Sequence, residues 1–233
     1  WVVIESYLML RDLLPVVRPD SVDSLLLALD RSIFGFEPAL WLERFNRRPI
    51  VEWFSFFYFS YFWINAAYLL VVLWVLAAGR LTSEYAIGSL LLMCVGQLGY
   101  CAVPGYGPIR YLADQYQGPI DGGFFWGCVW STVQAGSAMK DIFPSLHTAM
   151  PTWLTLFALM QARRDPRWRW PALLTGFFAL NIIASTMLLR WHYAVDVVAG
   201  LVLAFAVAAV APRLARWEED WRRQRRFGGV WDM

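Results

Sequence analysis

Five long apolar stretches restrict this chain to a narrow set of folds. They cover residues 50–78, 85–103, 147–162, 170–189 and 193–211. A helix crosses the hydrocarbon core of a bilayer in about 20 apolar residues, so each stretch predicts a membrane span. Residues 1–17 are a sixth candidate, although Glu5, Arg11 and Asp12 interrupt them. The sequence therefore predicts an all-α, polytopic membrane helix bundle with about six transmembrane helices.

The composition agrees with a membrane protein and excludes other classes. Hydrophobic residues make up 59% of the 233 residues and charged residues only 16%, whereas roughly a quarter of the residues of a soluble domain are charged. The net charge of +2 supplies no basic field for a nucleic acid. We expect one integral membrane domain over residues 1–233, with its catalytic core at about 84–211.

Two segments between the spans are long enough to have structure of their own. In 18–49, Leu25, Leu26, Leu29 and Ile33 recur near helical spacing while acidic and basic residues balance, which predicts a pair of amphipathic helices at the membrane interface. Residues 104–143 are rich in Gly, Pro and aromatic residues. A connection of that length predicts a functional loop.

Arginines indicate the orientation of the bundle. Four of them, at positions 163, 164, 167 and 169, fill one connection, and six more follow the last span. Because basic residues accumulate in cytoplasmic loops, this side and the C-terminus are predicted to be cytoplasmic. The segments 18–49 and 104–143 then lie on the extracytoplasmic side.

The chain has two histidines, His147 and His192, so any histidine chemistry must use one or both of them. The predicted topology puts both at the outer ends of spans. Asp196 follows His192 by four residues, so it faces His192 across one helical turn. A carboxylate there fixes the imidazole tautomer and leaves the other ring nitrogen as a nucleophile. The alternative is a His–Asp pair that only holds a helix in position.

Residues that would bind a phosphate group are predicted around these histidines. Pro144 and Ser145 are typical of a helix start, whose N–H groups suit a phosphate, although an ordinary capped helix has the same residues. Three cations, Arg110, Lys140 and Arg190, lie on the same side as both histidines. A phosphoryl group attracts such a cluster, while solvated or lipid-facing positions are the alternative for each.

These motifs resemble those of the type 2 phosphatidic acid phosphatase superfamily. Phe-Pro-Ser-Leu-His at 143–147 is similar to its Pro-Ser-Gly-His motif. Ser185, His192 and Asp196 match its third motif, Ser-Arg-x5-His-x3-Asp. The Pro-Ser-Leu-His variant and residues 29–35 are similar to the branch that contains inositol phosphorylceramide synthases and their bacterial relatives. The resemblance implies a bacterial inner (plasma) membrane protein with its site on the extracytoplasmic side.

The chain departs from the family pattern at the phosphate cradle. The first family motif, Lys-x6-Arg-Pro, is absent. Arg110 is a better counterpart of its arginine than the dipeptide Arg48-Pro49, which lies before the wrong span. Thr186 replaces the arginine of the third motif, and Leu146 replaces the glycine of the second. We therefore predict that Arg190, one helical turn after Thr186, supplies the missing charge.

The resemblance implies in-line attack by His192 on a lipid phosphate or phosphodiester. Asp196 orients His192, and His147 protonates the leaving alkoxide before it acts as base on the acceptor. The oxygens of the phosphate are held by Arg110, Lys140, Ser145 and Arg190. A histidine nucleophile requires no metal or other cofactor. Water as acceptor makes a phosphatase, and an alcohol such as an inositol-type compound makes a transferase.

Two other functions are alternatives to the phosphohistidine enzyme. A metal-dependent membrane hydrolase would use His147, His192 and Asp196 as three ligands, a number that suits catalytic zinc. A non-enzymatic transporter would use the histidines as proton relays, but the inverted repeats typical of transporters are not apparent in the sequence. The expected partners are membrane lipids in each case, with a lipid phosphate as the substrate of the enzyme.

Overall fold

The computed structural model describes residues 2–76, 79–136 and 140–227. These residues form ten α-helices and no strand, which confirms the all-α class. The helices are α1 (Val2–Val17), α2 (Asp23–Phe34), α3 (Pro38–Leu42), α4 (Arg48–Leu70), α5 (Gly79–Ala102), α6 (Pro108–Tyr111), α7 (Phe124–Gly136), α8 (Leu146–Ala162), α9 (Arg169–Leu188) and α10 (Ala194–Gln224). A π-helical stretch, Val71–Leu76, continues α4, and 3₁₀ turns occupy Glu43–Phe45, Ala113–Gln115 and Pro166–Trp168.

Among the described residues, four helices are long and apolar enough to cross a membrane. They are Arg48–Trp74, Gly79–Ala102, Pro166–Leu188 and Ala194–Gln224. The other two expected spans correspond to α1 and α8, which have 16 and 17 residues. The four long spans agree with the predicted membrane bundle, and six spans remain a prediction.

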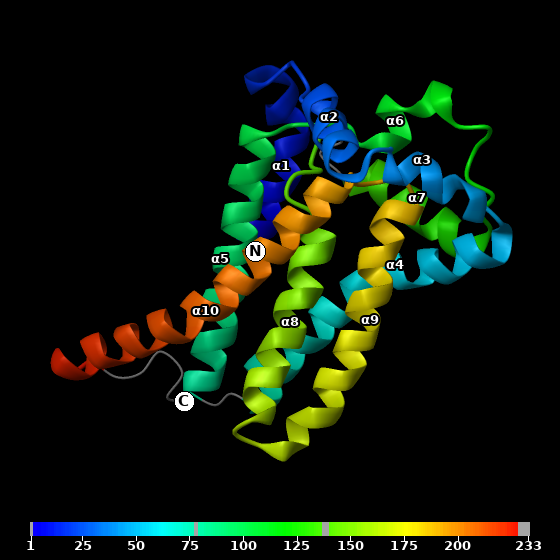
Figure 1. Cartoon of the computed structure of the whole chain (residues 1–233). Helices are drawn as coiled ribbons and strands as arrows, with labels where there is room; N and C mark the ends of the chain where they lie inside the picture. Colours follow the sequence, from blue (N-terminus) through cyan, green and yellow to red (C-terminus); the bar gives the residue numbers. More distant parts are fainter. Residues whose placement is uncertain (1, 77–78, 137–139, 228–233) are drawn as a thin grey trace.

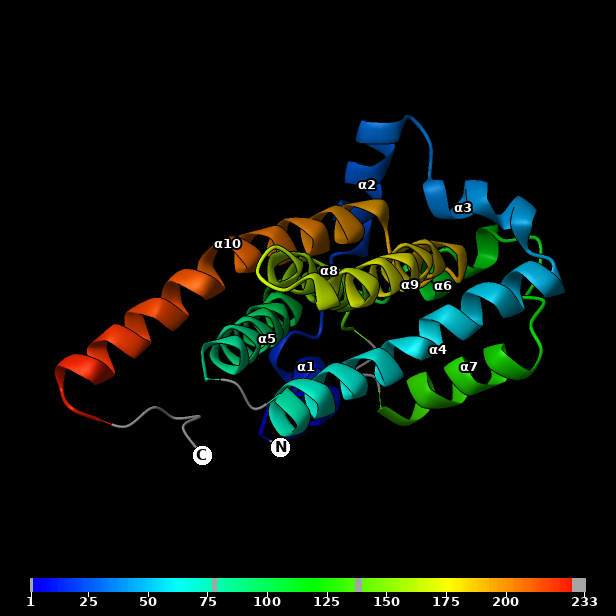
Figure 2. The ribbon, with the colours of Figure 1, turned by 90° about the horizontal axis from the view of Figure 1, so that it is seen from below.

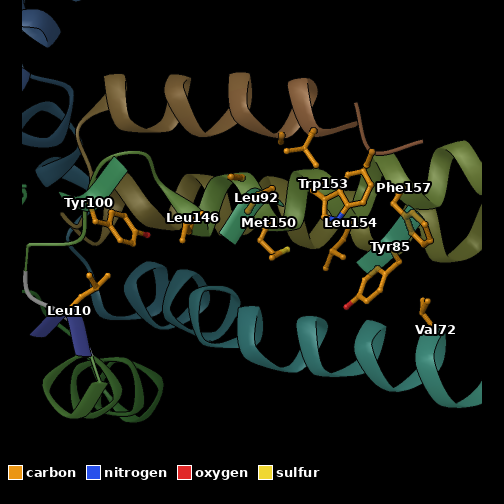
Figure 3. Packing of buried hydrophobic residues seen from close by; sticks show 14 of the residues in the cluster. Leu10, Val72, Tyr85, Leu92, Tyr100, Leu146, Met150, Trp153, Leu154 and Phe157 are labelled. Carbon is orange, nitrogen blue, oxygen red and sulfur yellow. The ribbon is translucent and has the colours of Figure 1, made fainter. Parts of the chain in front are cut away.

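The central helix of the bundle is α8. It packs against α4, α5, α9 and α10, and Figure 2 shows it among these neighbours. Trp153, Leu154 and Phe157 on this helix have no solvent exposure, and Figure 3 shows them in the main hydrophobic cluster with Tyr85 and Leu92 of α5. Contacts with four helices hold α8 in place, and its N-terminal end carries His147.

Glycines on α5 allow α8 to lie close to it. A Cβ atom at Gly88 would lie 2.1 Å from the Trp153 ring, and one at Gly96 would lie 2.4 Å from Leu146 Cδ2. Helices in membranes associate through such small residues because close packing replaces the missing hydrophobic drive. The contact with Leu146 fixes the position of the residue next to His147.

The amphipathic segment 18–49 forms two helices, as predicted, and these are α2 and α3. Leu25, Leu29 and Ile33 are 57%, 41% and 63% exposed, whereas Asp23 and Asp30 are fully buried. The reason is that the two carboxylates accept hydrogen bonds from the backbone around the histidine site, described below. Leu26 of the predicted stripe is buried, with 2% exposure. The other three members are left on the surface, as in helices that lie at a membrane interface.

The segment 104–143 is more ordered than the loop that its composition predicts. It contains α7, which packs against α4. Glu52 of α4 accepts hydrogen bonds from the backbone N–H groups of Gly123, Phe125 and Trp126, all at 2.9 Å. These contacts satisfy donors that the first turn of a helix cannot pair internally. A long-range cap therefore stabilises a helix in a segment rich in Gly and Pro.

Candidate active site

His192 and Asp196 form a buried pair at the start of α10. Their side chains are 5% and 0% exposed, and His192 Nδ1 lies 3.4 Å from Asp196 Oδ2. The same oxygen accepts a hydrogen bond of 2.9 Å from the backbone N–H of Tyr193. His192 precedes the N-cap residue Tyr193, so the pair spans the first turn of α10 rather than a regular helix face. The contact directs Nδ1 toward the carboxylate, so Nε2 is the ring nitrogen that points away from it.

The backbone before His192 is held in a tight reversal. The N–H groups of Trp191 and His192 both donate to the carbonyl of Thr186, at 2.9 and 3.1 Å. Arg190 closes this end of α9 with a φ of 65°, a left-handed conformation that usually requires glycine. A non-glycine residue in this region is strained, and such strain concentrates at functional sites. The reversal aims His192 back toward the interior of the bundle.

His147 is brought to His192 by a contact between the starts of α8 and α10. The backbone N–H of Ser145 donates to the carbonyl of Asp196 at 3.1 Å. The Ser145 hydroxyl accepts from the N–H of Thr148, which confirms the predicted helix cap. The imidazoles of His147 and His192 lie close enough to interact electrostatically. Two motifs that are far apart in the sequence therefore meet at one end of the bundle.

Close approach of these helices depends on Gly200. A Cβ atom there would lie 2.5 Å from the Ser145 carbonyl oxygen and 3.1 Å from Thr148 Cβ. We expect Gly200→Ala to destabilise the protein by about 1–3 kcal/mol and to lower activity, because the helices must separate. Gly176→Ala in α9 is the matched control, since its Cβ would meet only Thr155 Cγ2 at an ordinary 3.4 Å.

Thermal unfolding of both variants in detergent tests this expectation. The alanine substitution improves helix propensity equally at the two positions. A Gly200→Ala protein as stable and active as Gly176→Ala would mean that the close approach is not needed.

Aromatic rings enclose His147. Its ring stacks on Tyr58 with a centroid distance of 4.2 Å and an interplanar angle of 12°, and Tyr61 lies at 4.2 Å with a tilt of 32°. His147 Nε2 is buried and has no hydrogen-bond partner among the described residues. The two tyrosines restrict the ring to one orientation and leave this nitrogen available for a ligand.

Two carboxylates of α2 hold the backbone around the histidine pair, and sequence reasoning missed both. Asp30 accepts from the N–H groups of Ala194 and Val195 at 2.7 and 2.9 Å. Asp23 accepts from the N–H of Gly107 at 2.9 Å and from the hydroxyl of Tyr193 at 3.1 Å. Figure 1 shows α2, α6 and the start of α10 at the same end of the bundle. The amphipathic segment is thus part of the site's framework.

Glu37, the N-cap residue of α3, is a titratable neighbour of this framework. Burial raises the pKa of its carboxyl to about 7, and the nearby carboxylates of Asp30 and Asp196 act in the same direction. The backbone N–H of Ala39 and the charge of Arg31 oppose them. Glu37 therefore holds a proton in the folded protein at pH values where the unfolded chain has lost it.

Stability is expected to fall as the pH rises because of Glu37. Near pH 4.5, the usual pKa of this group, the unfolded chain begins to release the proton, while the folded protein keeps it up to about pH 7. The free energy of unfolding should decrease across this window and then level off. Thermal midpoints measured from pH 5 to 8 test the slope, and Glu37→Gln should flatten it. An unchanged slope in that variant would contradict the expectation.

Two of the predicted phosphate cations, Lys140 and Arg190, have partners within the protein. Lys140 Nζ donates to the carbonyls of Arg18, Pro19 and Asp20 at 3.0, 2.6 and 3.3 Å, so it stabilises the α1–α2 connection. Arg190 donates to the carbonyl of Gly118 at 2.9 Å and lies 3.2 Å from Glu43. Both side chains therefore have partners within the protein, and their role at a phosphate stays a prediction.

Arg110 is exposed on α6, beside the loop of residues 190–193 that carries His192. The N–H of Ile109 donates to the carbonyl of Arg190 at 2.7 Å, so α6 is fastened to the backbone that precedes His192. Gly107 also packs tightly against this backbone, because a Cβ atom at Gly107 would lie 2.3 Å from the Trp191 carbonyl oxygen. Two of the three predicted cations, Arg110 and Arg190, are thus tied to the backbone that leads into His192.

The arrangement gives no support to the metal-ligand alternative. No group of three or more His, Cys, Asp or Glu side chains that could hold a metal ion occurs within 2–76, 79–136 and 140–227.

The fold and the site together define a class: helical membrane proteins with two histidines and an aspartate at the adjoining ends of two packed helices. The chain belongs to the PAP2 superfamily, which its sequence matches over residues 24–210. Members of this superfamily are typically membrane phosphatases that act on phosphate esters. The match begins in α2 and ends in α10, so it includes the framework carboxylate Asp30. Neither the curated proteins nor the solved structures contained a match.

Proposed function

We propose that this protein transfers the phosphoryl group, or a phosphoryl-alcohol head group, of a membrane lipid through a phosphohistidine at His192. The observation that carries the proposal is the buried contact of 3.4 Å between His192 Nδ1 and Asp196 Oδ2, next to His147. A histidine held in this way presents Nε2 for in-line attack, and the carboxylate stabilises the cation that forms. Membership of the PAP2 superfamily supports phosphate-ester chemistry.

Each residue of the site has a proposed role. His192 attacks phosphorus while the bond to the leaving oxygen breaks, and His147 donates a proton to that oxygen. In the second step His147 takes a proton from the acceptor, whose oxygen attacks the phosphohistidine and restores His192. Arg110 and the N–H groups at the start of α8 stabilise the phosphate oxygens, because charge accumulates there in the transition state.

The acceptor and the membrane side are finer parts of the proposal. The Pro-Ser-Leu-His sequence supports the branch that is similar to inositol phosphorylceramide synthases, so we propose an alcohol acceptor beside water. The distribution of arginines supports a site on the extracytoplasmic side and a cytoplasmic C-terminus.

A labelled-substrate assay in detergent tests the chemistry. A lipid with a labelled phosphate should give a phosphoprotein that resists alkali and is cleaved by acid, as expected of a phosphohistidine. Free phosphate as the final product indicates hydrolysis, and a new labelled phosphodiester in the presence of an alcohol indicates transfer. Product formation without any labelled protein, even in rapid-quench samples, would overturn the covalent mechanism.

A further inference from the structure

The last helix, α10, is longer than a membrane span requires. Its 31 residues extend about 46 Å at 1.5 Å per residue, whereas the hydrocarbon core of a bilayer is about 30 Å thick. Residues 197–211 contain no charged residue, and charges become frequent from Arg213 onward. The helix therefore leaves the hydrocarbon core near Pro212. We call residues 213–227 the C-terminal extension.

The C-terminal extension projects away from the bundle. Figures 1 and 2 both show the last turns of α10 diverging from the other helices. In Figure 1 these turns lie toward the end at which α8 and α9 are joined, opposite α2 and α6. The extension is therefore far from the histidine site and has a surface of its own.

One face of this part of α10 carries an exposed apolar stripe. Its four members follow one another at intervals of four, three and four residues, a spacing that puts them on one side of a helix. Their exposed fractions lie between 36% and 65%, and they are Val210, Leu214, Trp217 and Trp221. Ala211 and Ala215 are buried on a different side, so the stripe is not the face that α10 turns toward the bundle.

Basic side chains surround the apolar stripe. The extension contains six arginines and three acidic residues. Glu218 and Glu219 pair with Arg222 and Arg223. Within the described part of the chain, the other four arginines take part in no ion pair, and they are Arg213, Arg216, Arg225 and Arg226. The extension therefore combines an apolar stripe with a net positive charge.

This combination fits the surface of an anionic bilayer. Tryptophan rings prefer the level of the lipid head groups, because they are apolar with one polar N–H group. Arginines near an anionic membrane surface contribute about 1 kcal/mol each to binding. A second copy of the chain fits the stripe less well, because pairing two extensions would bring their arginines together and like charges repel.

We propose that residues 210–227 form a docking surface for anionic phospholipids. The stripe lies at the boundary between head groups and acyl chains, and the arginines contact lipid phosphates, as in helices that lie along a membrane surface. The surface is at the other end of the bundle from His147 and His192. The inference is therefore independent of the proposed function.

The depth of a spin label in lipid nanodiscs tests whether the extension lies on the bilayer. The full chain carries Cys94→Ala, Cys101→Ala and Cys128→Ala, and one label is attached through Gln224→Cys at the last residue of α10. Glu219→Cys is the matched control, because five residues correspond to about 140° around the helix. Accessibility to oxygen and to a water-soluble nickel chelate gives the depth of each label.

The label at 224 is expected at the depth of the lipid phosphates in nanodiscs that contain phosphatidylglycerol. The label at 219 should stay in water, because it faces away from the stripe. In nanodiscs of phosphatidylcholine alone the label at 224 should move toward water, since the attraction of the arginines is lost. Thermal unfolding of both labelled proteins checks that they are folded.

Lipid affinity provides a second measurement, taken on the unlabelled chain by native mass spectrometry. Removing two charges with Arg213→Gln and Arg216→Gln should weaken phosphatidylglycerol binding about tenfold and leave phosphatidylcholine binding unchanged. The control is Arg167→Gln with Arg169→Gln, which removes two exposed charges from the α8–α9 connection. This control should change the affinity less than twofold.

Three results would overturn the docking surface. They are equal water accessibility of the labels at 224 and 219, the same depth at 224 in both kinds of nanodisc, and equal loss of phosphatidylglycerol affinity in the two arginine double variants. Spin–spin broadening at 224 in nanodiscs that hold two chains, with or without phosphatidylglycerol, would instead show that a second copy covers the stripe.

Discussion

His192→Ala is expected to lower turnover on the order of 10³-fold or more with every phosphate ester, because it removes the proposed nucleophile. The change should be independent of the leaving group. No labelled phosphoprotein should form, even under rapid quench, since the nitrogen that would carry the phosphate is absent. Steady-state turnover and labelling with a lipid phosphate and with p-nitrophenyl phosphate measure both effects.

His147→Ala should respond differently to the leaving group. A lipid alkoxide needs a proton to depart, so its release should slow by about 10²–10⁴-fold without His147. The p-nitrophenolate group departs without a proton, so labelling of His192 by p-nitrophenyl phosphate should remain close to that of the unmodified protein. The second step still lacks its base, and labelled protein should therefore accumulate.

This comparison tests the two histidine roles against each other. Equal losses for both substrates in His147→Ala, or p-nitrophenyl phosphate turnover that survives in His192→Ala, would show that the roles are wrongly assigned. Thermal unfolding of both variants in detergent checks that the loss is not one of folding. The Tyr58 and Tyr61 rings that enclose His147 make this check necessary.

Asp30→Ala is expected to have the second large effect, although Asp30 is outside both sequence motifs. Its carboxylate accepts from two backbone N–H groups, at Ala194 and Val195. Each buried N–H left without a partner costs about 1–3 kcal/mol, so the free energy of unfolding should fall by about 2–6 kcal/mol. Activity should fall further than stability alone explains, because these two residues follow His192 and Tyr193 directly.

Asp30→Asn and Asp114→Ala complete the experiment. The asparagine keeps one acceptor oxygen at the position and should recover part of both losses. Asp114 is an exposed acidic residue of the same type, and its removal should change neither quantity. Thermal midpoints and turnover are measured at one pH for all variants. An Asp30→Ala protein that unfolds at the same temperature as Asp114→Ala would show that the contact between α2 and α10 does not support the site.

The contact between His192 and Asp196 was predictable because its information is local. Asp196 follows His192 by four residues, and this spacing limits the two side chains to one turn, where the structure has them 3.4 Å apart. The Ser145 cap was predictable for the same reason, since its partner Thr148 is three residues away. His147 could be placed at the same end only through the alternation of the spans.

The partners of the buried charges were not predictable from spacing. Lys140 and Arg190 were expected at a phosphate, and nothing in their spacing indicated that Lys140 would donate to the carbonyls of 18–20 or that Arg190 would contact Glu43. Asp30 contacts residues 164 and 165 positions away, and no periodicity indicates such a pairing. Its carboxylate was counted among the balanced surface charges of an amphipathic helix.

The sequence by itself determined the membrane helix bundle, the ends at which the histidines lie and the His192–Asp196 pair, because span length and short spacing act within a single helix. Only the tertiary structure decided which carboxylates serve the site and how the tyrosines enclose His147. A buried polar group must find a partner wherever packing brings one. That partner is set by the contact of helices distant in the sequence, such as α2 with α10, and the local pattern of residues does not encode it.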